Sequence, residues 1–261
     1  MNSEQQYIDL YTESSEMIKS HSAEPLNAVR DRAFADFKVQ GFPTRKVERY
    51  KYTDMAALFA PDYGLNLNRL AIPVNPYDAF KCDVPNLSTS LYFIVNDSFY
   101  SQKLPQVQLP AGVIVDSLRH IAAEKPDFIA KYYAQIAATH EDAVTALNTM
   151  LAQDGLFVYV PKNVKVDRTI QIINILRADV DLMVNRRVLV VMEQGAEAKL
   201  LFCDHATDDR KFLSTQVIEA YVGDNASLEL NCLEETHLKN VRVSNVYIEQ
   251  QANSRVNHNV I

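Results

Sequence analysis

Three segments in the last third of the chain share one pattern of apolar and polar residues. They are Arg187–Asp204, Ser214–Cys232 and Val241–Val260. Each has a β-rich run, a turn of small or polar residues, and a second run in which apolar and polar residues alternate. The last two align without a gap at a spacing of about 28 residues. Because such a repeat must stack on a neighbour to bury its apolar face, the pattern favours a β-solenoid over ordinary antiparallel hairpins.

The alternation also predicts which side chains face the inside of this solenoid. Aligning the repeats matches the inward positions Ala198, Leu200 and Phe202 with Leu228, Leu230 and Cys232. We therefore expect Cys232 to be buried. Cys203 and His205 fall on outward positions, so we expect both at the surface and no metal site between these residues. His258 aligns with Leu230 and is expected in the core as a satisfied histidine.

Apolar residues recur at helical spacing over much of the first half of the chain. We expect helices over residues 3–20, 25–40, 117–138 with a break at Pro126, and 142–151. From Gly155 onward the period changes to that of strands, so we place a domain boundary there, between residues 1–154 and 155–261. The sequence thus predicts a mainly β chain with an α-helical N-terminal domain.

Composition narrows the class of protein. Hydrophobic residues make up 48% of the 261 residues, which permits a sizeable core. No apolar run approaches the roughly 20 residues of a membrane span, and the polar N-terminus lacks the pattern of a secretory signal, so we expect a cytoplasmic protein. A net charge of −7 argues against nucleic acid as the main partner. Cys82, Cys203 and Cys232 are too scattered for a disulfide framework, and the isolated Cys82 is expected to be structural.

The segment Gly41–Asp54 mixes four cations with aromatic residues. Such a mixture could bind RNA or an acidic partner. It could also be a simple turn, leading into an amphipathic segment pinned by Tyr50 and Tyr52. On the preceding helix, Arg30 belongs to a charged face that we expect to be solvated.

Two stretches resemble a known family. Within Pro25–Phe59 the chain reads GFPTRK, then Glu48, then KYT, and Tyr50 stands where the family more often has tryptophan. Ala146–Ile175 carries an ALN helix, a glycine and a strand that ends in valine-proline. Together these stretches cover about a quarter of the chain. They resemble the SufB/SufD family of the SUF machinery for iron–sulfur cluster assembly, and the first stretch favours its SufD branch.

The resemblance implies a right-handed parallel β-helix and a non-catalytic scaffold subunit. Its implied partners are a SufB-like subunit and a SufC-like ATPase, and the assembled complex, rather than this chain, would build the iron–sulfur cluster. We carry over no catalytic, cofactor-binding or metal-binding residue, because the family's functional cysteine and histidine belong to a later part of the β-helix. The chain also shows no cap after Ile261, so we expect it to be the N-terminal part of such a protein, truncated or incomplete.

Two other classes remain open from the residues alone. A carbohydrate-active β-helix enzyme would repeat carboxylates at one point of successive turns. The aligned outward positions instead hold Lys199, Glu229 and Asn257, which do not repeat one chemistry. A purely structural interaction module is the other class, and measurements of cluster transfer would separate it from a scaffold.

Overall fold

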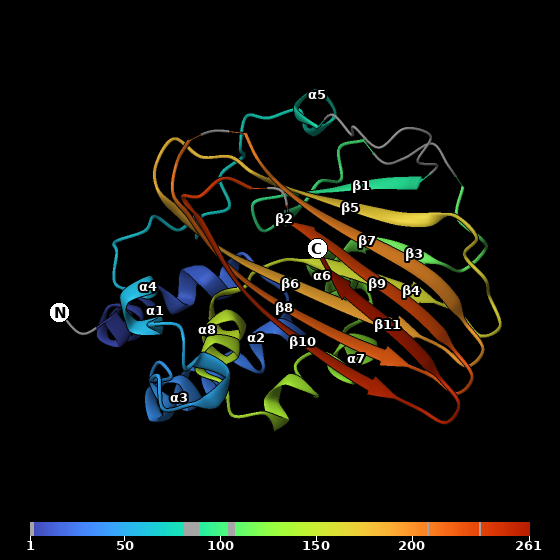
Figure 1. The fold of residues 1–261 in the computed structure, drawn as a ribbon, viewed down its shortest axis with the longest axis horizontal. Coiled ribbons are helices and arrows are strands. Elements are labelled where there is room, and N and C mark those ends of the chain that lie inside the picture. Colours follow the sequence, from blue (N-terminus) through green and yellow to red (C-terminus); the bar gives the residue numbers. More distant parts are fainter. Residues whose placement is uncertain (1–2, 81–88, 104–107, 208, 235) are drawn as a thin grey trace.

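A computed structural model describes residues 3–80, 89–103, 108–207, 209–234 and 236–261. Two sheets face each other, and most of the helices gather beside one of them (Figure 1). The helical elements are α1 Ser3–Ser20, α2 Glu24–Asn27, α3 Arg30–Gln40, the 3-10 turn η1 Glu48–Tyr50, α4 Met55–Phe59, α5 Pro76–Ala79, α6 Leu118–Glu124, α7 Pro126–Ala130, the 3-10 turn η2 Ala137–Thr139 and α8 Ala143–Leu151. The expected helix over residues 25–40 is therefore two helices, α2 and α3.

The strands form two sheets by stacking successive turns of the chain. They are β1 Thr89–Val95, β2 Ser98–Phe99, β3 Ile114–Ser117, β4 Leu156–Val160, β5 Thr169–Leu176, β6 Leu182–Met192, β7 Glu197–Ala206, β8 Phe212–Val222, β9 Ser227–Glu234, β10 Asn240–Gln250 and β11 Arg255–Val260. One sheet has the order β11-β9-β7-β5-β1-β2 and the other β10-β8-β6-β4-β3. The predicted mainly β fold with a parallel β-solenoid is thus confirmed.

The register of the strands matches the sequence alignment. Glu249 lies beside Tyr221, and Asn257 lies beside Glu229, each 28 residues apart. Strands β1 and β3 come before Gly155, yet β1 pairs in parallel with β5 and β3 pairs antiparallel with β4. Residues before Gly155 therefore contribute to both sheets, and the domain division at that residue stays a prediction.

One corner of the solenoid repeats the same backbone turn. Asn163, Gly195, Asn225 and Asn253 all have φ between 57° and 67°, a region that glycine and asparagine tolerate best. Neighbouring corners are joined by backbone hydrogen bonds, such as that from Gly195 N to the Asp224 carbonyl at 2.8 Å. These backbone turns fix the number of residues in each repeat, because each corner turn must lie directly on the corner turn of the preceding repeat.

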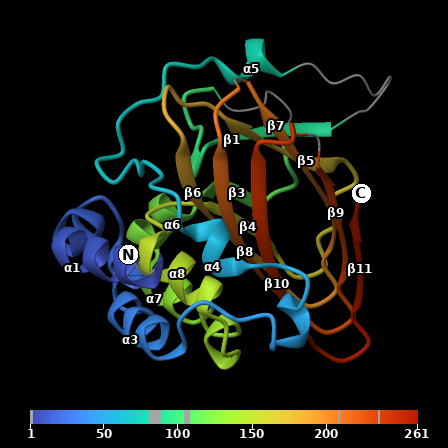
Figure 2. The same ribbon diagram turned by 60° about the vertical axis from the view of Figure 1, so that its left-hand side comes forward.

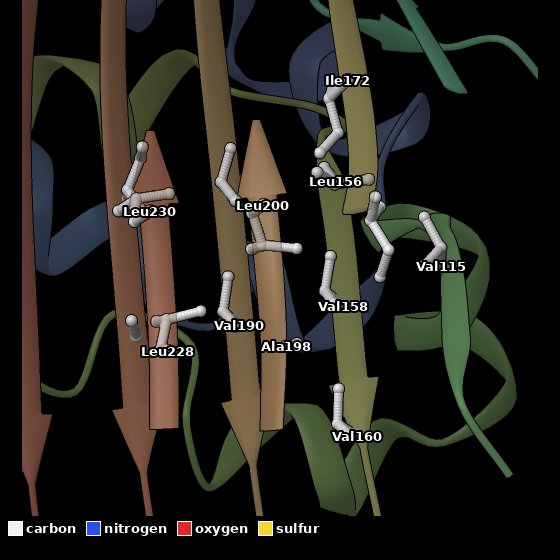
Figure 3. Packing of buried hydrophobic residues seen from close by; sticks show 14 of the residues in the cluster. Val115, Leu156, Val158, Val160, Ile172, Val190, Ala198, Leu200, Leu228 and Leu230 are labelled. Carbon is white, nitrogen blue, oxygen red and sulfur yellow. The ribbon is translucent and has the colours of Figure 1, made fainter. Parts of the chain in front are cut away.

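The space between the sheets is filled by the inward side chains that the alternation predicts. Figure 3 shows Val190, Leu200 and Leu230 in this core, each from a different strand. Cys232 lies in the same cluster. Since adjacent turns contribute to one continuous core, each turn stabilises the next by burying its apolar area.

The helices cover the outer face of the five-stranded sheet (Figure 2). Met183 of β6 and Leu213 of β8 point into an aromatic cluster with Phe37 and Phe59. The prediction that Arg30 lies on a solvated face is wrong, because its guanidinium is fully buried and donates to the Met150 carbonyl at 3.0 Å. Arg30 instead joins α3 to the end of α8.

Candidate functional site

Among the residues that the structure describes, the cysteines and histidines do not converge on one site. Cys232 is buried as predicted, at 3% exposure, and burial raises the pKa of its thiol to about 11. The prediction of a surface Cys203 is wrong. Its side chain does point outward from the sheet, but it packs against Phe93 and Ile175. His205 is only partly exposed, since its ring lies 5.0 Å from that of Phe80.

The prediction that His258 lies in the core is also wrong. It occupies the inward position that the alignment predicts, beside Leu230, but it is exposed. The reason is that β11 is the edge strand of its sheet, so His258 is covered from one side only. Cys82 lies outside the described residues.

A charged layer fills one part of the solenoid interior. Arg186 of β6, Asp204 of β7 and Arg242 of β10 all occupy inward positions. Asp204 accepts hydrogen bonds from Arg186 Nη1 and Arg242 Nη1, both at 2.6 Å. Arg242 also contacts Glu234 at the end of β9. The layer therefore links four strands from both sheets.

The charges in this layer compensate one another. Burial alone would raise the pKa of Asp204, but Arg186 and Arg242 outweigh it and hold that pKa below its usual value. Asp204 is therefore ionised at neutral pH, and the two guanidiniums face two carboxylates. A cavity of about 20 Å³ beside Arg186, Asp204 and Arg242 is large enough for roughly one water molecule. This geometry suits cross-linking of the sheets and leaves no room for a substrate.

A second buried ion pair fastens the helical layer to the outside of the solenoid. Arg187 Nη2 lies 2.5 Å from Glu219 Oε2, and both side chains are fully buried. The Glu219 carboxylate also accepts from the backbone N–H groups of Ala134 at 2.8 Å and Ala137 at 2.9 Å. The Arg187 guanidinium lies over the ring of Tyr133, 4.7 Å from its centroid. One carboxylate thus holds strand β6 and the segment that follows α7.

Sequence reasoning missed both ion pairs. The available signal was charge inside strands that are otherwise apolar: Arg186 and Arg187 stand between Val184 and Val188, and Glu219 between Ile218 and Ala220. A charge at such a position is rarely buried unless it is paired. The sequence could have indicated that partners exist, but not which residues they are.

The outward face of the six-stranded sheet carries a mixed ladder. Lys199, Glu229 and Asn257 are neighbours on successive strands, as predicted, and Lys199 Nζ lies 3.3 Å from Glu229 Oε2. A carbohydrate-active enzyme would need two carboxylates near one point, and this ladder pairs its single carboxylate with a cation.

Two further features of the described residues concern metal binding and membrane spanning. Within them, no three side chains of His, Cys, Asp or Glu gather closely enough to hold a metal ion. Likewise, none of their helices has the length and apolar character needed to cross a membrane.

Comparison with known protein families covers nearly the whole chain. Residues 1–172 match the model of the SufBD protein N-terminal region. Residues 174–261 match that of the SufBD core domain of SUF system FeS cluster assembly. The two regions follow one another without overlap.

Individual curated relatives are similar to the chain at modest sequence identity. The iron–sulfur cluster assembly protein SufD of Bacillus subtilis is 28% identical over 154 residues, which are 58% of this chain and 35% of that protein. Protein ABCI7, chloroplastic, of Arabidopsis thaliana is 23% identical over 243 residues, which are 89% of this chain and 49% of that protein. The aligned residues thus span about half or less of these relatives. On the two family matches and the parallel β-solenoid, the chain belongs to the SufB/SufD family of SUF-system iron–sulfur cluster assembly proteins.

Proposed function

We propose that this chain acts as a non-catalytic scaffold subunit of a cytoplasmic SUF complex, in the SufD role. It pairs with a SufB-like subunit and depends on a SufC-like ATPase for energy. The observation that carries the proposal is the family's N-terminal region followed directly by its core domain. The similarity to SufD of Bacillus subtilis and the GFPTRK signature at Gly41–Lys46 support the SufD role within the family.

The electrostatics of the interior support a scaffold. The buried guanidiniums of Arg186 and Arg187 each face a carboxylate, so neither stands ready to polarise a substrate. Cys232 is held in its protonated form, which is a poor nucleophile and a poor metal ligand. These groups stabilise the stack of turns, and the iron–sulfur cluster is the cargo of the assembled complex.

Co-expression tests the proposal. The gene product that contains this chain is tagged and produced with the SufB-like and SufC-like proteins of the same genome. We expect the three to co-elute in a fixed ratio and to support ATP-dependent cluster formation on an apoprotein. Recovery of the tagged protein alone, while the other two still associate, would contradict it. A complex that forms but never transfers a cluster would instead indicate a structural interaction module.

A further inference from the structure

Most of the family signature forms an exposed loop that takes no part in the buried ion pairs described above. Residues 44–54, here called the basic crest, connect α3 to α4. Every side chain in it except Tyr50 is exposed. Tyr52, expected to pin this segment, is 89% exposed and has the Lys51 ammonium 5.0 Å from its ring centroid. The crest therefore presents a large aromatic side chain to solvent together with cations.

The backbone beneath the crest is held firmly in place. Tyr50 donates its hydroxyl to the buried Asp142 at 2.6 Å, at the start of α8. At one end, the ring of Phe42 stacks on Phe59 with centroids 4.5 Å apart. At the other end, the Asp54 carboxylate caps α4 by accepting from Ala57 N at 3.0 Å. Such a pre-organised loop loses little conformational entropy when it binds.

The charges of the crest favour an acidic partner. Its four cations are Arg45, Lys46, Arg49 and Lys51. Its two carboxylates do not cancel them, so the crest is basic on a chain whose net charge is −7. Its internal pairs, such as Lys51 with Glu48 at 2.5 Å, are solvent-exposed and contribute only about 0–1 kcal/mol. Arg45 and Lys51 can therefore exchange Asp54 and Glu48 for the carboxylates of a docked molecule at little cost, whereas Arg49 lies 3.4 Å from the buried Asp142.

We propose that the basic crest is a docking surface for an acidic segment of a partner protein. Carboxylates of the partner contact Arg45 and Lys46, and an apolar side chain packs on Tyr52. Tyrosine and arginine are the residue types that dominate protein–protein hot spots. A polyphosphate backbone fits less well, because Glu48 and Asp54 interrupt the row of cations and would face some of its evenly spaced phosphates.

A fluorescent peptide of alternating Glu and Asp with a central Leu-Phe pair is the probe, measured by anisotropy on the whole chain. We expect saturable binding that weakens as salt is raised. Arg45→Glu with Lys46→Glu should weaken it on the order of tenfold or more, and Tyr52→Ala by several-fold. The matched control is Lys162→Glu with Arg168→Glu, which makes the same change of charge on exposed residues between β4 and β5 and should leave binding unchanged.

Several results would overturn the proposal. One is an equal loss in both double variants, which would show that only net charge matters. Another is tighter binding to a single-stranded oligonucleotide or to phosphatidylglycerol vesicles than to the peptide. Absence of peptide binding to the unmodified chain is the third. Circular dichroism of each variant establishes that it is folded. No other SUF subunit is present, so the result is independent of the co-expression test.

Discussion

Replacing Glu219 with glutamine tests whether one buried carboxylate fastens the helical layer to the solenoid. The substitution keeps the shape but removes the charge that faces Arg187 Nη2 at 2.5 Å. It also replaces an oxygen that accepts from Ala134 N or Ala137 N by an amide nitrogen, which cannot accept. Since both charged side chains are fully buried, solvent cannot screen the guanidinium left behind. Removing one partner of such a pair costs about 3–5 kcal/mol.

The assay is urea unfolding followed by circular dichroism, with the free energy of unfolding extrapolated to water. The matched control is Glu229→Gln, which removes the carboxylate from a solvent-accessible pair with Lys199 at 3.3 Å and should cost no more than about 1 kcal/mol, since the amide oxygen can still accept from Asn231. A loss for Glu219→Gln within about 1 kcal/mol of the control would refute the reasoning, because the buried pair would then contribute no more than a surface pair.

A double substitution separates charge from packing. Arg187→Met with Glu219→Leu removes both charges, so no unpaired ion is left in the core. We expect it to recover part of the stability lost by Glu219→Gln. Recovery should be incomplete, because the N–H groups of Ala134 and Ala137 lose their acceptor, at about 1–3 kcal/mol each. A double variant less stable than Glu219→Gln would contradict this account.

Three further predictions concern the charged layer, one corner of the solenoid and the buried cysteines. Asp204 has a depressed pKa in the folded state, so its contribution to stability is present above its unfolded pKa of about 4. This contribution is lost as the pH falls through the folded pKa. The difference in unfolding free energy between the unmodified chain and Asp204→Asn should therefore shrink below about pH 4. Gly195→Ala should destabilise the chain by about 1–2 kcal/mol in the same urea assay, because φ is 67° there and a Cβ would lie 2.4 Å from Asn163 Oδ1. A neutral effect would show that this corner of the solenoid is not constrained. Cys203 and Cys232 should both resist a maleimide reagent until urea unfolds the chain, as read by mass spectrometry, whereas rapid labelling of Cys203 in the folded state would contradict its burial.

The repeat and its register were determined by the sequence itself. A strand has a period of two, so the alternation around Leu200 and Leu230 specified which side chains enter the core. Turn residues such as Asn225 and Asn253, 28 positions apart, specified where each turn of the solenoid begins again. Both signals are local, which is why the burial of Cys232 could be predicted.

What lies against each face was decided only by the tertiary structure. Parity placed Cys203 on the outside of the sheet, but the segment carrying Tyr77 and Phe80 folds back over that face and buries it. Parity likewise placed His258 inside, although an edge strand leaves it exposed. Arg30 was predicted to be a surface charge, yet its guanidinium donates to the carbonyls of Thr149 and Met150 in α8, more than a hundred residues away in the chain. A local pattern specifies the direction in which a side chain points, whereas its burial and its ion-pair partner depend on segments that only folding brings together.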